Sequence, residues 1–238
     1  MNQTEIVIDA MRQNGGYATF GQLNTLVDFS LWKTKTPYAS VRRIVQKNSN
    51  FFKIRPGLWA LTEFKDEVLE KFQIKKSDKK QENLFTHSYY QGLLVEIGNM
   101  KKLKTCVPAQ DKNRKFLEKP LREIVTLEKI YEFTYPEILC RATTVDVVWF
   151  NERKLPHSFF EVEHSTDIQN SLMKFFELQD YFARFFIVAA KARKLLFDSI
   201  INRSIFNPIK SRIDFWDYES IATQYSKMFE LSQMKRQL

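Results

Sequence analysis

Two short apolar segments of this chain carry acidic residues, and this combination constrains the fold more than any other feature. The segments read Thr-Val-Asp-Val-Val-Trp-Phe at 144–150 and Ser-Phe-Phe-Glu-Val-Glu-His-Ser-Thr at 158–166. Their content of Val, Phe and Trp, with turn formers between them, predicts two strands. Successive strand residues face opposite sides, so Glu161 and Glu163 point the same way. If the strands are neighbours, these two acids and Asp146 converge at one end of a sheet.

Three carboxylates in one place repel one another, and burying them is costly unless a cation or a proton offsets the charge. Hard divalent cations such as Mg²⁺ prefer carboxylate oxygens. We therefore predict that Asp146, Glu161 and Glu163 are metal ligands and catalytic residues, because such sites usually serve phosphoryl-transfer chemistry. The competing interpretation is that each acid simply faces water.

The composition indicates a globular protein with a real core. The chain has 238 residues, of which 44% are hydrophobic, enough for one large or two small domains. No apolar run approaches ~20 residues, so no membrane span is expected. The N-terminal residues lack a signal-peptide pattern, and Cys106 and Cys140 fit neither a metal site nor a disulfide framework. A cytoplasmic protein is expected.

The net charge of +9 is concentrated in the first part of the chain. No acidic residue occurs between Asp28 and Glu63. That stretch contains seven basic residues, namely Lys33, Lys35, Arg42, Arg43, Lys47, Lys53 and Arg55. Such a block is typical of a surface that contacts a polyanion, although a solvated basic face without a partner remains an alternative.

The same region has the pattern of three helices and a hairpin. Helical patterns cover 4–14 and 19–27, a third helix begins near Pro37, and two short strands flank the turn Pro56-Gly57. This order predicts a winged helix, in which the third helix usually lies in the DNA major groove.

The region also resembles the HARE-HTH winged-helix module of restriction endonucleases and chromatin proteins. The matching stretches are Thr36-Pro37, Ser40-Val41-Arg42-Arg43, Phe51-Phe52-Lys53-Ile54 and Pro56-Gly57-Leu58-Trp59-Ala60-Leu61. The resemblance implies DNA binding. The candidate DNA-binding residues are Lys35, Tyr38, Ser40, Arg42, Arg43, Lys47, Lys53 and Arg55.

We predict a winged-helix domain at 1–72, a charged linker at 73–82 and a second domain at 83–238. The helix and strand patterns of the second domain follow the order αβ, then ββαβαβα, which predicts a mixed sheet flanked by helices. The expected fold class is therefore α+β, with a winged helix joined to an α/β domain.

The second domain resembles the PD-(D/E)XK nuclease superfamily over about 83–220. Asp146 matches the Asp of the motif, Glu161 matches its second acid, and Glu163 stands where the motif usually has Lys. Glu96 matches a helix position where many members place an accessory acid. The resemblance implies that Asp146 and Glu161 hold Mg²⁺, that Glu163 orients the water directly or through a metal, and that Glu96 supports them.

These expectations favour a metal-dependent endonuclease of restriction type that hydrolyses phosphodiester bonds in double-stranded DNA, with the winged helix aiding recognition. Two alternatives stay open: a non-catalytic DNA-binding regulator with an inert nuclease-like domain, and a structure-specific repair nuclease. A restriction role would pair the protein with a cognate DNA methyltransferase. Double-strand cutting of a symmetric site often uses a homodimer.

Overall fold

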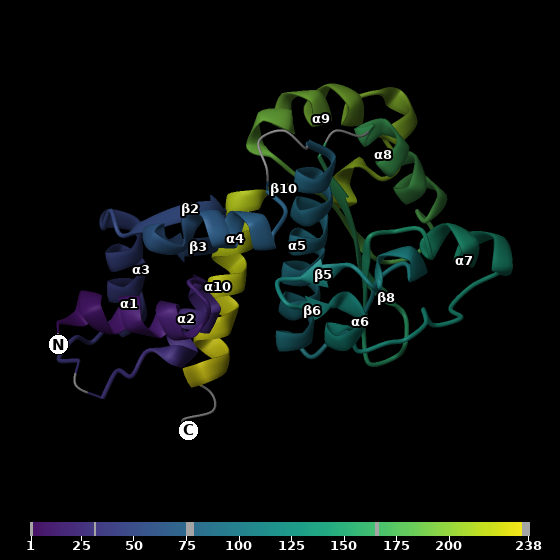
Figure 1. Ribbon diagram of the computed structural model, residues 1–238. Helices are drawn as coiled ribbons and strands as arrows, with labels where there is room; N and C mark the ends of the chain where they lie inside the picture. Colours follow the sequence, from purple (N-terminus) through teal and green to yellow (C-terminus); the bar gives the residue numbers. More distant parts are fainter. Residues whose placement is uncertain (1, 31, 75–78, 165–166, 235–238) are drawn as a thin grey trace. The chain divides into compact units, whose positions relative to one another are not determined.

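The structure is a computed structural model that describes residues 2–30, 32–74, 79–164 and 167–234 (Figure 1). The chain forms two compact units, one of Met1–Glu82 with Ala222–Leu238 and one of Asn83–Ile221. The linker expected at 73–82 lies partly outside the described residues, and its last part already belongs to the helix α5 (Lys79–Met100).

The first unit combines small helices with a three-stranded sheet. Its elements are α1 (Gln3–Gln13), β1 (Tyr17–Thr19), α2 (Phe20–Leu26), α3 (Pro37–Lys47), β2 (Phe51–Arg55), β3 (Leu58–Leu61), α4 (Lys65–Lys71) and most of α10 (Tyr218–Met234). Asn2 caps α1 and Thr19 caps α2, each within a capping box. Gly57, with a φ of 84°, makes the turn between β2 and β3, which pair antiparallel. The three helices and the hairpin occur in the predicted order.

Residues 222–238 were expected in the second domain, but they cluster with the first unit. The physical reason lies on α10, whose aromatic side chains cover α2. A Cβ atom added to Gly21 would lie 3.0 Å from Tyr225 and 3.1 Å from Phe229. Glu230 also forms an ion pair with Arg42 of α3. These contacts join segments that are far apart in the sequence.

The second unit is built on a mixed five-stranded sheet. Its other main elements are β4 (Lys104–Cys106), β5 (Lys115–Phe116), β6 (Lys119–Pro120), α6 (Leu121–Ile124), α7 (Pro136–Ala142), β7 (Val147–Phe150), β8 (Pro156–Glu163), α8 (Ile168–Glu177), β9 (Arg184–Ala189), α9 (Lys194–Ile201) and β10 (Ile213–Asp217). The strand order is β10-β9-β8-β7-β4. The pairs β10–β9 and β9–β8 are parallel, whereas β8–β7 and β7–β4 are antiparallel. The predicted α+β class with a mixed sheet is confirmed.

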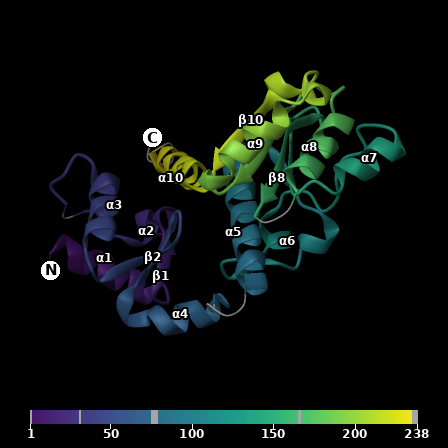
Figure 2. The ribbon, with the colours of Figure 1, turned by 90° about the horizontal axis from the view of Figure 1, so that it is seen from above.

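Helices cover both faces of this sheet (Figure 2). On one face, Phe159 packs in a core that includes Leu172 of α8 and Phe197 of α9. On the other face, the indole N–H of Trp149 donates a 3.1 Å hydrogen bond to the carbonyl of Leu94 in α5. Because β8 alternates its side chains, Glu161 and Glu163 share the α8 face with Phe159.

The close approach of α5 to the sheet depends on Gly98. A Cβ atom there would lie 2.6 Å from Thr105 Cγ2 and 2.6 Å from Trp149 Nε1. We expect Gly98→Ala to lower the free energy of unfolding by about 1–3 kcal/mol through overpacking. Urea denaturation measures the change, with Asn83→Ala on the exposed side of α5 as the control. A stability gain, which helix propensity alone would produce, contradicts this packing.

Candidate active site

Asp146 and the two acids of β8 come together at one end of the β7–β8 pair. Asp146 directly precedes β7, and Val147 is in register with Phe160. The Oδ2 atom of Asp146 accepts a 2.7 Å hydrogen bond from the backbone N–H of Val162, so its side chain lies against β8. Burial raises the pKa of the Glu161 carboxyl to about 8, and the nearby charges of Asp146 and Glu163 add to this effect.

Helix α8 supplies polar partners for the two acids of β8. The Nζ atom of Lys174 lies 2.9 Å from both carboxylate oxygens of Glu161. The hydroxyl of Ser171 is within hydrogen-bond distance of Glu161 and of Glu163. Residues three apart on a helix lie on the same face, so both side chains reach the same strand. The sequence reasoning missed Lys174, which forms an ion pair with Glu161.

Helix α5 and the segment after β4 contact Asp146 from another direction. The Nε2 atom of His87 lies 3.4 Å from Asp146 Oδ1 and 3.8 Å from Asp111 Oδ2. The amide of Gln91 donates to Asp111 Oδ2 at 2.7 Å and to the Asp146 carbonyl at 3.1 Å. Among the described residues, His87, Asp111 and Asp146 offer ligand atoms that all lie within 4.8 Å of one another.

The charges of this second group stabilise one another. Burial disfavours a charged His87, but the hydrogen bonds and charges of Asp111 and Asp146 outweigh it and raise its pKa to about 10. Burial alone would raise the pKa of Asp111, yet bonds from His87 and Gln91 and the charge of Arg114 lower it. These contacts favour the protonated form of the His87 ring.

Glu96, the expected accessory acid, lies on a different turn of α5 from His87. It lies nine residues after His87, which places it about 13.5 Å further along α5 and on the opposite side of the helix. Burial raises its pKa, and the charge that opposes this shift belongs to Lys119. The helix instead contributes His87 and Gln91. Sequence periodicity locates the helix but does not show which turn meets the strand ends.

The candidate DNA-binding residues of the first unit fall into two groups. Exposed side chains belong to Lys35, Arg43, Lys47 and Lys53. The other four side chains are buried or have partners within the unit. The Tyr38 ring packs edge-on against Phe29, and Ser40 is buried. Arg42 pairs with Glu230, and Arg55 pairs with Glu82.

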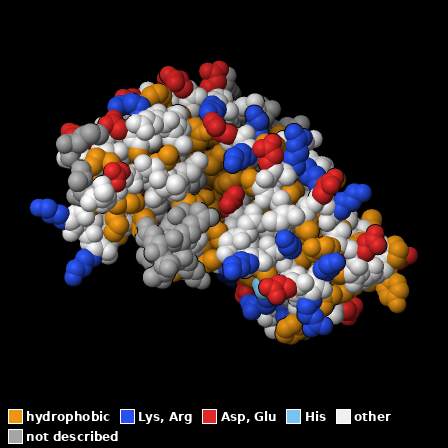
Figure 3. All heavy atoms as spheres, turned by 90° about the horizontal axis from the view of Figure 1, so that it is seen from below, with side chains coloured by type: hydrophobic (Ala, Val, Ile, Leu, Met, Phe, Trp, Pro, Cys, Tyr) orange, Lys and Arg blue, Asp and Glu red, His pale blue; other side chains and the backbone are white. Residues whose placement is uncertain are grey.

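Two of these placements correct the expectation that the side chains face DNA. The hydroxyl of Ser40 donates to the Thr36 carbonyl at 3.3 Å, inside the helix. The guanidinium of Arg42 lies over the Phe20 ring, 5.7 Å from its centre, and pairs with Glu230. The outward stripe of α3 is therefore formed by Arg43 and Lys47. On the face drawn in Figure 3, Lys and Arg side chains are interspersed with acids.

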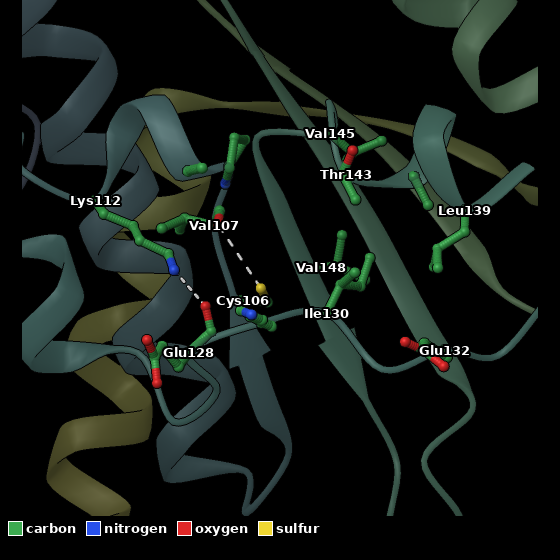
Figure 4. Close-up of a pocket in the computed structure, with 14 residues that line it drawn as sticks. Cys106, Val107, Lys112, Glu128, Ile130, Glu132, Leu139, Thr143, Val145 and Val148 are labelled. Atoms are coloured by element: carbon green, nitrogen blue, oxygen red, sulfur yellow. Dashed lines mark hydrogen bonds between the residues drawn. The ribbon is translucent and has the colours of Figure 1, made fainter. Parts of the chain in front are cut away.

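A cavity of about 280 Å³ opens beside the strand that follows Asp146. Its wall is mainly apolar and includes Val145, Val148 and Leu139 (Figure 4). Burial raises the pKa of the Cys106 thiol in this wall to about 11, which keeps it neutral. Asp111, Asp146, Glu161 and Glu163 do not line the cavity, so the cavity is separate from the charged residues described above.

None of the helices in the described part of the chain has the length and apolar character needed to cross a membrane.

Comparison with known proteins supports a nuclease assignment. Residues 67–237 match the family model described as the Type II restriction enzyme NmeDI C-terminal domain. A search of curated proteins found no match, and a search of solved structures found none. The matched region includes Asp146 and all the residues described above as its neighbours on β8, α8, α5 and the segment after β4. Because it also covers most of the sequence, the chain belongs to the restriction endonuclease family represented by the C-terminal domain of the Type II restriction enzyme NmeDI.

Proposed function

We propose that this protein is a Mg²⁺-dependent endonuclease of restriction type that hydrolyses phosphodiester bonds in double-stranded DNA. The observation that carries the proposal is the arrangement of Asp146, Glu161 and Lys174 around the end of β8. Two adjacent carboxylates with an ammonium group suit phosphate chemistry, because they can hold a cation and still orient a water molecule. Membership of a restriction enzyme family supports the same chemistry.

The residues present fit a hard divalent cation. Asp146, just before β7, and Glu161, in the neighbouring strand β8, would supply oxygen ligands, and the proximity of the Asp146 charge helps to raise the pKa of Glu161. The side chain of Asp146 is 14% exposed, so solvent reaches it. When bound there, Mg²⁺ would offset charge on the scissile phosphate and lower the pKa of its water. Asp146 and Glu161 would hold the ion.

Lys174 takes the part that the superfamily usually gives to a lysine on the strand. Its ammonium group is bonded to Glu161 and to the carbonyl of Thr144 at 3.1 Å, which fixes it beside the strand end. From there it can donate a hydrogen bond to the attacking water or to a phosphate oxygen. This placement weighs against an inert nuclease-like domain, whose best support was the missing lysine at position 163.

Glu163 stays a candidate for orienting the water or binding metal, and we propose an indirect role for it. Its side chain lies against the Ser171 hydroxyl, which also contacts Glu161. Glu163 would then hold Ser171 and, through it, the orientation of Glu161.

We further propose that the first unit is a winged helix that binds DNA through the outward stripe of α3. Arg43 and Lys47 would contact phosphates, and Lys53 of β2 would contact the backbone as part of the wing. Cutting both strands of a symmetric site would be carried out by a homodimer, the arrangement that such enzymes often use. Protection of the host genome would need a cognate methyltransferase.

The double variant Arg43→Ala/Lys47→Ala is expected to bind duplex DNA at least about tenfold more weakly at moderate salt. Each lost phosphate contact removes about one unit from the slope of log K against log salt, so the slope should become shallower by about two units. Fluorescence anisotropy over a salt series measures both quantities. Arg42→Gln is the matched control and should leave the slope unchanged, because Arg42 pairs with Glu230. Equal effects of the two variants would contradict the assigned face.

The function is tested by incubating the purified protein with long bacteriophage DNA, methylated and unmethylated, in Mg²⁺ and in chelator. The proposal expects discrete fragments in Mg²⁺ and intact DNA in chelator. A gel shift without any cleavage would favour a DNA-binding regulator. Cleavage confined to branched or flapped substrates would favour a repair nuclease. Either of these results would overturn the restriction-type proposal.

A further inference from the structure

The group formed by His87, Asp111 and Asp146 has the geometry of a metal-binding site with a nitrogen ligand. Two ligands of an ion held at about 2.1 Å lie roughly 3.0–3.5 Å apart in octahedral or tetrahedral coordination. The distance from His87 Nε2 to Asp146 Oδ1 is 3.4 Å, and that to Asp111 Oδ2 is 3.8 Å. All three ligand atoms lie within 4.8 Å of one another, which is close enough for them to share one ion after some movement of the side chains.

A separate observation concerns Gln91, whose amide nitrogen contacts two of the three residues. This side chain is fully buried. Its NH₂ group is committed to Asp111 and to the Asp146 carbonyl, which fixes the orientation of the amide. The Oε1 atom has no hydrogen-bond partner among the described residues. A buried oxygen without a partner is costly, and a water molecule bound to an ion held by the neighbouring Asp111 would offer it a hydrogen bond.

Asp111 is held in place by a second partner. The Asp111 side chain is only 4% exposed, and the Nε atom of Arg114 holds its other oxygen, Oδ1, at 3.1 Å. This contact leaves Oδ2 directed towards His87. A carboxylate held by an outer partner in this way is typical of an ordered metal ligand.

We propose that His87, Asp111 and Asp146 form a cation site that prefers divalent transition-metal ions, with Mn²⁺ as the ion to test. Imidazole suits transition ions, whereas Mg²⁺ and Ca²⁺ favour sites made only of oxygen. This site is distinct from the Asp146–Glu161 pair and shares only Asp146 with it. It deepens the proposed function by defining which ions can join the nuclease centre, but binding there does not require that the protein cut DNA.

The test uses the full chain without DNA, so that its result does not depend on cleavage. Pulsed electron paramagnetic resonance of bound Mn²⁺ detects a directly coordinated ¹⁴N nucleus. The sequence contains three histidines, His87, His157 and His164, so each can be replaced in turn by glutamine. We expect a nitrogen signal in the wild type, its loss in His87→Gln, and its retention in the other two variants. Circular dichroism checks that each variant is folded.

A second variant covers the case in which His87→Gln does not fold. Asp111→Asn keeps the side-chain shape and removes one charge, and we expect it to weaken Mn²⁺ binding at the nitrogen-coordinated site at least about tenfold. Absence of a nitrogen signal in the wild type would overturn the proposal. So would persistence of the signal in His87→Gln or its loss in His164→Gln. Failure of the nuclease proposal would appear differently, as nitrogen-coordinated Mn²⁺ in a protein that does not cut DNA.

Discussion

Asp146→Asn is expected to lower the rate of DNA cleavage about a thousandfold or more while the protein stays folded. Asp146 is the residue that both ionic groups share, through proximity to Glu161 on one side and to His87 on the other. Loss of its charge weakens cation binding at the site where charge develops on the phosphate. A metal ion contributes several kcal/mol there, and about 4 kcal/mol corresponds to a factor of roughly a thousand.

Single-turnover cleavage measures this effect, since it isolates the chemical step from product release. Asparagine keeps an oxygen that can accept the hydrogen bond from Val162, so the fold should be retained. Asp214→Asn is the matched control, because Asp214 lies on the edge strand β10 and forms a partly exposed ion pair with Arg184 of β9. If Asp146→Asn cuts DNA at the wild-type rate, Asp146 does not belong to the active site.

Lys174→Met should reduce the rate of cleavage by about a hundredfold to a thousandfold. The side chain is 16% exposed and is the cation bonded to Glu161. Its removal takes away a donor for the attacking water or the phosphate, and such donors contribute about 10²–10³ to the rate. The free energy of unfolding should fall less than is usual for a broken buried ion pair. The reason is that Glu161, whose pKa is already about 8, can take up a proton.

Two comparisons separate this role from a structural one. Lys174→Arg keeps the positive charge and should recover part of the activity, whereas Lys191→Met removes an exposed lysine of the same unit and should have no effect. The positive charge of Lys174 lowers the pKa of Glu161, so its removal in Lys174→Met should raise that pKa. The pH at which the cleavage rate rises should therefore move upward. Full activity in Lys174→Met would show that Lys174 only balances charge.

The strands and the meeting of three acids were predictable because they follow from local rules. Val, Phe and Trp define β7 and β8, and strand alternation places Glu161 and Glu163 on one face. The caps of α1 and α2 are equally local, since a capping box needs only residues three apart.

The partners of the acids could not be predicted because they depend on how separate elements meet. Lys174 reaches Glu161 only through the rotation of α8 against the sheet, and His87 reaches Asp146 only through the position of α5. Asp111 ends a 3₁₀ helix, Ala109–Asp111, which is too short to show periodicity in the sequence. The sequence also could not show which turn of α5 meets Asp146, because helix spacing admits several faces and only packing against the sheet selects one.

The first unit also contains a contact that the sequence did not predict. Basic residues on α3 were expected to face DNA as a set, but Arg42 points to Glu230, which lies 188 residues further along the chain. No local sequence pattern predicts a contact between residues so far apart in the chain. The amphipathic spacing separates the buried Val41 and Val45 from the rest, yet it does not show which polar positions another helix covers.

The most direct test of the central claim is anomalous X-ray diffraction from crystals of the protein grown with duplex DNA and Mn²⁺. The account predicts an anomalous peak about 2.2 Å from carboxylate oxygens of both Asp146 and Glu161, beside a DNA phosphate. The claim would be contradicted by crystals that contain bound DNA and Mn²⁺ but show every anomalous peak away from Asp146 and Glu161, with Glu161 still paired with Lys174.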